Sequence, residues 1–253
     1  MSTSTVYLVS GSNRGIGLGL VTQILAMHET AFVYAGARNP EAAPELEKLR
    51  AEYPGRIALV NCVSGDNEGN VALAKEIEAR HGRVDTVIAN AGTSSRLRST
   101  ATCAIRNMYT LYVNVTGTVV LFQAVYDLLK KSADPRFIPI TSVGGRLSGG
   151  LIETPFGNVS YGASKAALNW VSRKIHFENP WLTCFPLSPG GVDTDMVQTA
   201  FAEDKTGVFE KIVDGNMIEP DVAAAILVKL VDESTRQKDG GEYVDRDGSR
   251  LAW

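Results

Sequence analysis

Short apolar segments alternate with longer helical patterns from one end of this chain to the other. Several of the segments lack the alternation of a half-exposed strand, as expected where a strand is buried on both faces. They are Val6–Ser10, Ala31–Ala37, Arg56–Val63, Val84–Asn90, Phe137–Ser142, Leu182–Leu187 and Glu242–Val244. Strands that are separated by helices pair in parallel and are covered by those helices. The sequence therefore predicts an α/β fold in which seven strands form one doubly wound parallel sheet with helices on both faces.

The length and composition fit one domain. A chain of 253 residues, of which 44% are hydrophobic, can bury one large core and leaves little for a second. We therefore expect a single domain over residues 1–253. The net charge is -3, and the lysines and arginines form no dense block. Binding to nucleic acid or to an anionic membrane surface is not expected from such a chain.

The cysteines and the first residues bear on the compartment. Cys62, Cys103 and Cys184 are widely separated and odd in number, which indicates neither a disulfide framework nor a metal site. The chain passes from Met1 directly into a strand-like segment without the pattern of a signal peptide. No apolar stretch is expected to span a bilayer. We expect a cytoplasmic protein without a bound metal.

Two segments have the composition of loops over a site. Residues 143–160 contain five glycines and a proline, a density of turn residues that argues against regular structure. Residues 196–219 carry mixed helical signals and end at Glu219-Pro220, which is typical of a helix start. Both segments follow predicted strands, and open α/β sheets bind ligands at the carboxyl ends of their strands. We expect both segments to contact the substrate.

A glycine-rich turn follows the first predicted strand and opens an apolar helix. It has the sequence Gly11-Ser12-Asn13-Arg14-Gly15-Ile16-Gly17. Glycines at such a turn let a pyrophosphate approach both the backbone and the N-terminus of the helix. The order of strand, glycines and helix predicts a dinucleotide site in a Rossmann-like fold, although the spacing G-x-x-x-G-x-G differs from the more familiar G-x-G-x-x-G.

Tyr161 and Lys165 lie four residues apart at the start of an alanine-rich helical pattern. Residues at this spacing share one face of a helix, so that the ammonium group can favour the ionised form of the phenol. Ser142 ends an apolar strand, and Asn114 lies further upstream. Together the four residues indicate a hydride-transfer site with a proton donor. Taken singly, each could instead be an ordinary tyrosine, lysine, strand-end serine or helix interruption.

These motifs resemble those of the short-chain dehydrogenase/reductase family. The resemblance rests on the glycine turn, Asn90-Ala91-Gly92, Asn114 within Val113-Asn114-Val115, Ser142, Tyr161 with Lys165, and Pro189-Gly190-Gly191-Val192-Asp193-Thr194. The segments Lys174–Thr183 and Asp247–Trp253 are further similar to the norsolorinic-acid ketoreductase group, which reduces polyketide ketones.

The resemblance implies a role for each motif. Asn114, Ser142, Tyr161 and Lys165 would be the catalytic residues, with Asn114 at a break in a long helix, where it binds a water that relays protons. The cofactor-binding residues would be Gly11, Asn13, Arg14, Gly15, Ile16, Gly17, Arg38, Val63, Asn90, Ala91, Gly92, Tyr161, Lys165, Pro189, Val192 and Thr194. Of these, Asn90, Ala91 and Gly92 would line the adenosine side, and Val192 and Thr194 would meet the nicotinamide carboxamide and phosphates.

The end of the second strand bears on the choice of nicotinamide. An acidic side chain there would bind a ribose 2′-hydroxyl and repel a 2′-phosphate. The chain has Arg38 instead, and Arg14 supplies a second cation in the glycine turn. Charge-assisted contacts from both would suit NADP (NADPH). NAD remains the alternative, since Glu41 is close in sequence and Arg38 could be a solvated loop residue.

Two positions depart from the family pattern. The family usually has an aspartate after the third strand, whereas this chain has Asn61-Cys62-Val63, so that adenine contacts would depend on Asn61 or on backbone near Val63. The 19-residue interval from Ser142 to Tyr161 is long and implies an enlarged loop beside the substrate.

The function expected from the resemblance is NADP-dependent reduction of a bulky aromatic or polyketide-like ketone, with hydride from NADPH and a proton from Tyr161. Two alternatives stay open: an NAD-dependent alcohol dehydrogenase, and a nicotinamide-sensing protein without turnover. The family commonly forms homodimers or homotetramers through its long helices. The apolar residues Leu168, Trp170 and Val171 would permit such contacts or could equally belong to the core.

Overall fold

A computed structural model describes residues 4–94, 97, 108–213 and 217–253. Its main sheet has six parallel strands in the order β3-β2-β1-β4-β5-β6. The strands are β1 (Val6–Ser10), β2 (Phe32–Ala37), β3 (Ile57–Asn61), β4 (Thr86–Ala89), β5 (Arg136–Pro139) and β6 (Thr183–Cys184). The order reverses beside β1, and this is the position at which doubly wound sheets bind ligands. The predicted α/β class with a doubly wound parallel sheet is confirmed.

The prediction of seven strands in one sheet is wrong in detail. The segment expected as one strand over 182–187 is divided into β6 and β7 (Leu187–Ser188), and β7 pairs in parallel with β8 (Val244–Asp245) as a second, two-stranded sheet. The division falls at Phe185-Pro186, because a proline has no amide hydrogen to donate to a neighbouring strand. A bridge between Ile140 and Leu187 keeps the second sheet beside the end of β5.

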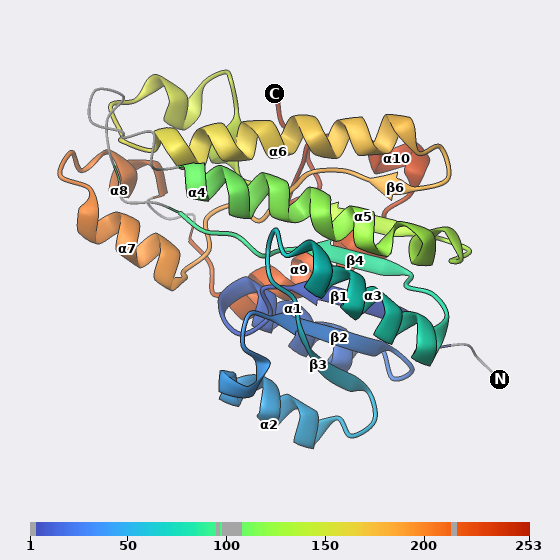
Figure 1. The fold of residues 1–253 in the computed structure, drawn as a ribbon. Helices are drawn as coiled ribbons and strands as arrows, with labels where there is room; N and C mark the ends of the chain where they lie inside the picture. The colour runs from blue at the N-terminus through green and yellow to red at the C-terminus, as the bar shows by residue number, and fades with distance from the viewer. Residues whose placement is uncertain (1–3, 95–96, 98–107, 214–216) are drawn as a thin grey trace.

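Helices cover both faces of the main sheet (Figure 1). The α-helices of the described residues are α1 (Gly15–Met27), α2 (Pro44–Glu52), α3 (Asn67–His81), α4 (Met108–Leu111), α5 (Gly117–Lys130), α6 (Val159–Glu178), α7 (Asp195–Glu203), α8 (Val208–Val213), α9 (Pro220–Asp232) and α10 (Arg236–Asp239). The start of α9 at Pro220 agrees with the helix start expected there.

The two faces of the sheet belong to separate apolar clusters. Tyr7 and Val9 of β1 pack in a cluster with residues of α1, α2 and α9. Val6 and Leu8, which alternate with them, pack with residues of α3, α5 and α6. Because successive side chains of a strand point to opposite faces, a strand buried on both faces is apolar throughout. This explains the continuous apolar segments of the sequence.

The two segments expected as substrate loops contain more helix than anticipated. Residues 143–160 form two short 3-10 turns, Val143–Gly145 and Gly150–Glu153, before α6 begins. Residues 196–219 contain most of α7 and all of α8, and three of them, 214–216, lie outside the described residues. Cys103 also lies outside the described residues. The other two cysteines, Cys62 and Cys184, are buried free thiols.

One helical stretch of the described chain, Tyr109–Lys130, has the length and composition of a membrane span, with a mean hydropathy of 1.2. None was expected from the sequence. Within the fold, this stretch is part of the protein's core. Its residues Leu121, Val125 and Leu129 are buried in the apolar cluster that joins α5 to the sheet, α3 and α6. A core helix passes the same test of length and composition, so that the stretch is weak evidence for a span.

The helix α6 settles one alternative that the sequence left open. Leu168 is buried and Val171 packs against the core cluster, so both serve the protein's own core. Trp170 is 66% exposed and is the one member of this trio that is available for a contact with another molecule.

Candidate active site

The glycine turn between β1 and α1 is shaped by its lack of side chains. Gly11 and Gly15 have φ angles of +68° and +54°, a region that glycine enters at little cost. A Cβ atom on Gly17 would lie 2.1 Å from the carbonyl oxygen of Gly11, and one on Gly11 would lie 2.8 Å from the Cα atom of Ala91. The turn is therefore a cradle that any side chain would fill.

The N-terminus of α1 suits an anion. The first turn of this helix, all of it described, has no acidic side chain, and the side chain of its N-cap residue Arg14 makes no capping hydrogen bond. Amide groups at a helix N-terminus attract negative charge. Asn13 and Arg14 are exposed beside them. The turn thus fits the pyrophosphate of a dinucleotide, as the sequence predicted.

The segment after β4 is bound to the same turn. The amide of Asn90 donates to the carbonyl oxygens of Ser10 and Gly11 at 3.0 and 3.1 Å, and the amide nitrogen of Ala91 donates to the Ser10 hydroxyl at 3.0 Å. Asn90 therefore holds the shape of the turn from within. Gly92 lies beside two of the expected catalytic residues, because a Cβ there would lie 3.4 Å from Asn114 Oδ1 and 3.8 Å from Lys165 Nζ.

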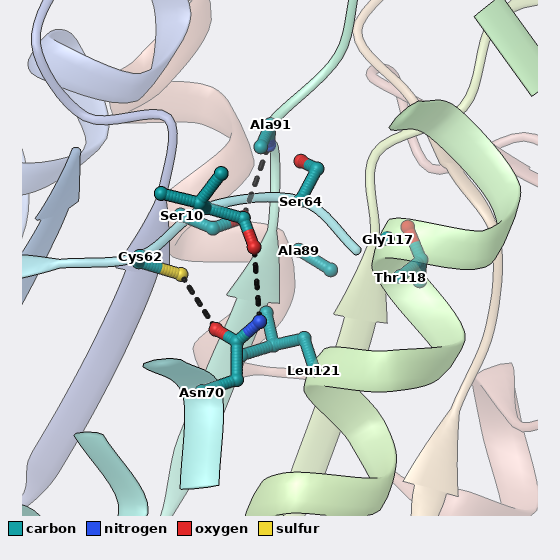
Figure 2. Close-up of a pocket in the computed structure, with 10 residues that line it drawn as sticks. Ser10, Cys62, Ser64, Asn70, Ala89, Ala91, Gly117, Thr118 and Leu121 are labelled. Atoms are coloured by element: carbon teal, nitrogen blue, oxygen red, sulfur yellow. Dashed lines mark hydrogen bonds between the residues drawn. The ribbon is translucent and has the colours of Figure 1, made fainter. Parts of the chain in front are cut away.

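A small cavity next to this segment is lined by Cys62, Asn70 and Ala91 (Figure 2). Asn70 of α3 is fully buried, and its amide donates to the carbonyl oxygens of Val63 and Asp66 at 3.0 and 2.7 Å. The Cys62 thiol donates to the amide oxygen of the same residue at 3.5 Å. Asn70 was missed in the sequence. The only local sign of its role is the helix start at Asp66, whose carboxylate caps α3 by accepting from the Gly69 amide.

The end of β2 places Arg38 at the surface. Its side chain is exposed, and its carbonyl oxygen accepts a hydrogen bond of 2.9 Å from the amide of Asn61 at the end of β3. Asn61, which replaces the family's usual aspartate nearby, thus fixes the backbone at Arg38. Arg14 forms an ion pair of 2.9 Å with Asp195, the first residue of α7, and both side chains are largely exposed. Arg38 is therefore an exposed cation at the end of β2, whereas the Arg14 guanidinium, expected as a second cation for the cofactor, is paired with a carboxylate.

The segment that follows β7, residues 189–194, contacts the glycine turn. Val192 is buried and bridges to Ile218. The methyl group of Thr194 lies 3.5 Å from the position that a Cβ on Gly15 would take. Pro189 follows β7 directly. The structure therefore brings Thr194 to the glycine turn, as expected.

Asn114 lies at an interruption of a long helix, as the resemblance implied. A π-helical turn, η3 (Tyr112–Thr116), separates α4 from α5. The buried Asn114 amide donates to the carbonyl oxygen of Thr93 at 3.0 Å and to the Ser164 hydroxyl at 2.9 Å, and its oxygen accepts from the Thr93 amide at 2.8 Å. π turns inside helices are frequent at functional sites. Asn114 thereby ties the strand-end segment after β4 to α6.

Tyr161, Lys165 and Ser142 meet at the start of α6. The Lys165 ammonium is buried, lies 5.7 Å from the centre of the Tyr161 ring, and donates to the carbonyl oxygen of Ile140 at 2.8 Å. The Ser142 hydroxyl lies close enough to the Tyr161 phenol to influence its pKa. Ser142 also accepts from the Gly144 amide at 3.1 Å. The four expected catalytic residues thus converge on one place.

The pKa of the Tyr161 phenol shifts in the direction opposite to the expectation. Burial raises the pKa of Tyr161, and the Ser142 hydroxyl opposes this rise. Lys165 was expected to lower the pKa of the phenol, but the ammonium is occupied by the Ile140 carbonyl, and desolvation dominates. Burial also lowers the pKa of Lys165 itself to about 8.

The two segments expected as substrate loops contact each other through aromatic rings. Phe156, just before α6, stacks on Phe209 of α8 with ring centres 4.8 Å apart and planes within 8°. Phe201 of α7 lies 4.9 Å from the same Phe209 ring. Aromatic side chains contribute large apolar contact areas. The cluster joins the two segments through buried apolar contacts, and it was not anticipated residue by residue from the sequence.

A substitution in the glycine turn tests the cradle. We expect Gly17→Ala to abolish measurable binding of NADPH, because its methyl group would collide with the Gly11 carbonyl. The matched control is Gly19→Ala in the same helix, where the added Cβ meets Ala224 at 2.9 Å and disturbs only the packing on α9. Both variants should lower Tm, but only Gly17→Ala should weaken NADPH binding in fluorescence titration. Equal affinities for the two variants would contradict the cradle.

Comparison with known proteins is consistent with this geometry. The profile of the short chain dehydrogenase family matches residues 5–205. A short chain dehydrogenase of Penicillium aethiopicum is 32% identical over 97% of this chain and 98% of its own, and a norsolorinic acid ketoreductase of Aspergillus parasiticus is 31% identical over 98% and 91%. The NADPH-bound carbonyl reductase from chicken fatty liver is 27% identical, with a TM-score of 0.86 over 99% of both chains. The protein therefore belongs to the short-chain dehydrogenase/reductase family of oxidoreductases, which use a nicotinamide cofactor.

Proposed function

We propose that this protein is an NADPH-dependent ketoreductase that acts on a bulky, aromatic or polyketide-like ketone. The observation that carries the proposal is the convergence of Ser142 and Tyr161 hydroxyls with the buried Lys165 ammonium, next to a cradle for a dinucleotide. The likeness to a norsolorinic acid ketoreductase and to an NADPH-bound carbonyl reductase supports it. We further propose that the whole chain acts as one catalytic domain in a cytoplasmic homo-oligomer.

The proposed mechanism gives each side chain one task. NADPH, when bound, supplies the hydride. The Tyr161 phenol donates its proton to the carbonyl oxygen, and the Ser142 hydroxyl donates a hydrogen bond to the same oxygen. The two donors stabilise the negative charge that develops on that oxygen. The raised pKa of Tyr161 keeps the phenol protonated at neutral pH, as reduction requires.

Lys165 and Asn114 support the proton donor. Lys165 would hold the ribose hydroxyls of the nicotinamide with its ammonium group. Asn114 holds the segment of Thr93 against α6 and would position the water through which protons reach Lys165. The preference for a large aromatic ketone is supported by the likeness to a norsolorinic acid ketoreductase.

Purified protein should oxidise NADPH in the presence of ketones. We would compare NADPH and NADH across aliphatic, aryl and polyhydroxyanthraquinone ketones by the loss of absorbance of the reduced nicotinamide. The expected result is turnover with NADPH that is highest for the fused aromatic ketones. Turnover confined to NAD and alcohols would favour a dehydrogenase instead. Cofactor binding without turnover on any ketone would favour a sensor.

Cofactor preference should depend on Arg38. We expect Arg38→Asp to raise the KM for NADPH by about 30-fold or more, because a carboxylate at the end of β2 repels a 2′-phosphate and binds a ribose hydroxyl. The KM for NADH should fall in the same variant. Lys174→Asp near the end of α6 is the control, since it changes the net charge equally away from the turn. Unchanged KM values in Arg38→Asp would remove Arg38 from the cofactor site.

A further inference from the structure

The back of the candidate site is formed by Tyr243, the residue before β8. Its side chain is fully buried, and its phenol donates a hydrogen bond to the carbonyl oxygen of Ser142. Thr141 and Asn169 lie beside the same phenol. Burial raises the pKa of Tyr243 to about 12, so that the phenol is a constant donor over the pH range of catalysis.

The Ser142 carbonyl is held by two donors at once. Besides the Tyr243 phenol, it accepts a hydrogen bond of 2.9 Å from the Gly145 amide. A carbonyl oxygen has two lone pairs, and both are engaged here. This fixes the peptide plane that follows Ser142, and with it the direction in which the Ser142 side chain leaves the backbone. The orientation of the hydroxyl toward Tyr161 thus depends on a residue 101 positions later in the chain.

Trp253 contacts both Tyr243 and the segment that follows Ser142. The ring of Trp253 stacks on Tyr243 with centres 5.5 Å apart, and its carbonyl oxygen accepts from the Ser148 hydroxyl at 3.1 Å. The guanidinium group of Arg173 lies 4.9 Å from the Trp253 ring and donates to the Gly241 carbonyl at 2.7 Å. The segment that begins at Ser142 is therefore held at its first residue and again six residues later.

We propose that Tyr243 is a positioning residue for catalysis, which sets the Ser142 hydroxyl in line with the ketone oxygen, and that Trp253 holds Tyr243 in place. Tyr243 reaches the reaction only through the Ser142 backbone. The proposal rests on the proposed function, because it assigns Ser142 a hydrogen bond to the reacting carbonyl. It adds a catalytic purpose for the C-terminal segment, which lies outside the family match to residues 5–205.

The test is a double-mutant cycle between Tyr243→Phe and Ser142→Ala. Phenylalanine keeps the ring and removes only the hydroxyl. We expect Tyr243→Phe to lower kcat by about tenfold while the KM for NADPH stays unchanged, the scale of one hydrogen bond. In the Ser142→Ala background the same change should have no further effect, because residues that act as a unit are not additive. Tyr7→Phe is the control, since that phenol donates to the remote Asp232 and should leave kcat unchanged.

Two readouts separate the possible failures. The proposal would be overturned if Tyr243→Phe lowered kcat equally in the wild-type and Ser142→Ala backgrounds, or if it did not lower kcat at all. Either result would leave the proposed function intact. Hydrogen exchange of the amides of residues 143–148 needs no turnover, and it should become faster in Tyr243→Phe. Unchanged exchange would overturn the proposal even if no ketone were reduced. If Tyr243→Phe did not fold, Trp253→Ala would replace it in the same cycle, with the same dependence on Ser142 expected.

Discussion

Tyr161→Phe is expected to lower the rate of ketone reduction by about a thousandfold, within the range of a lost general acid. Phenylalanine preserves the ring that packs over Lys165 and removes the phenol that lies beside the Ser142 side chain. Because the substitution leaves the glycine cradle intact, NADPH should still bind. Steady-state loss of NADPH absorbance measures the rate, and fluorescence titration measures the retained binding.

Tyr126→Phe on α5 is the matched control for that substitution. The Tyr126 ring packs edge-on against Phe122 and Trp181, so that the variant loses a tyrosine hydroxyl without touching the site. Its activity should remain within about twofold of the wild type, as is usual for a hydroxyl with no buried partner. If Tyr161→Phe retained turnover within tenfold of the wild type, another group would have to supply the proton, and the assignment of Tyr161 would fail.

Lys165→Met should have opposite effects on activity and on stability. Burial lowers the pKa of Lys165 from 10.5 to about 8, so below about pH 8 both folded and unfolded chains carry the ammonium. Between pH 8 and 10.5 the unfolded chain binds more protons, and the free energy of unfolding therefore rises with pH. At about 1.4 kcal/mol per pKa unit, the charged folded state is destabilised by about 3 kcal/mol at neutral pH.

Methionine removes this cost and this pH dependence. We expect Lys165→Met to be more stable than the wild type by about 3 kcal/mol at pH 7, with a difference that shrinks to near zero by pH 10.5. Urea unfolding at a series of pH values measures it, and Lys174→Met, which alters an exposed lysine of the same helix, is the control. The same variant should lose about a hundredfold or more in reduction, the scale of a lost positioned catalytic group. A pH dependence equal to that of the wild type would show that Lys165 is not a buried cation.

The sequence predicted best those parts of the site that depend on neighbours along the chain. The turn from Gly11 to Gly17 is local, since its glycines are required by backbone contacts within the turn and with Ala91. Tyr161 and Lys165 share a helical face by spacing alone. The position of Asn114 at a helix interruption also agreed with the family resemblance.

The errors and omissions have a different physical origin. The division of the sixth strand followed from one residue, Pro186, which can pack in a strand but cannot donate to it. Asn70 and Tyr243 support the site through hydrogen bonds to backbone carbonyls, and such carbonyls carry no mark in the sequence. The direction of the Tyr161 pKa shift depends on whether the nearby ammonium has another partner, which only the folded position of Ile140 reveals.

Transfer of hydride from NADPH to a ketone is tested most directly with NADPH deuterated at C4 of the nicotinamide. The protein would be incubated with this cofactor and a fused aromatic ketone, and the product would be analysed by mass spectrometry and NMR. The expected result is an alcohol with deuterium on the carbinol carbon for the wild type, and almost none for Tyr161→Phe. NADPH binding without deuterium in any product, or equal transfer by both proteins, would contradict reduction with Tyr161 as the proton donor.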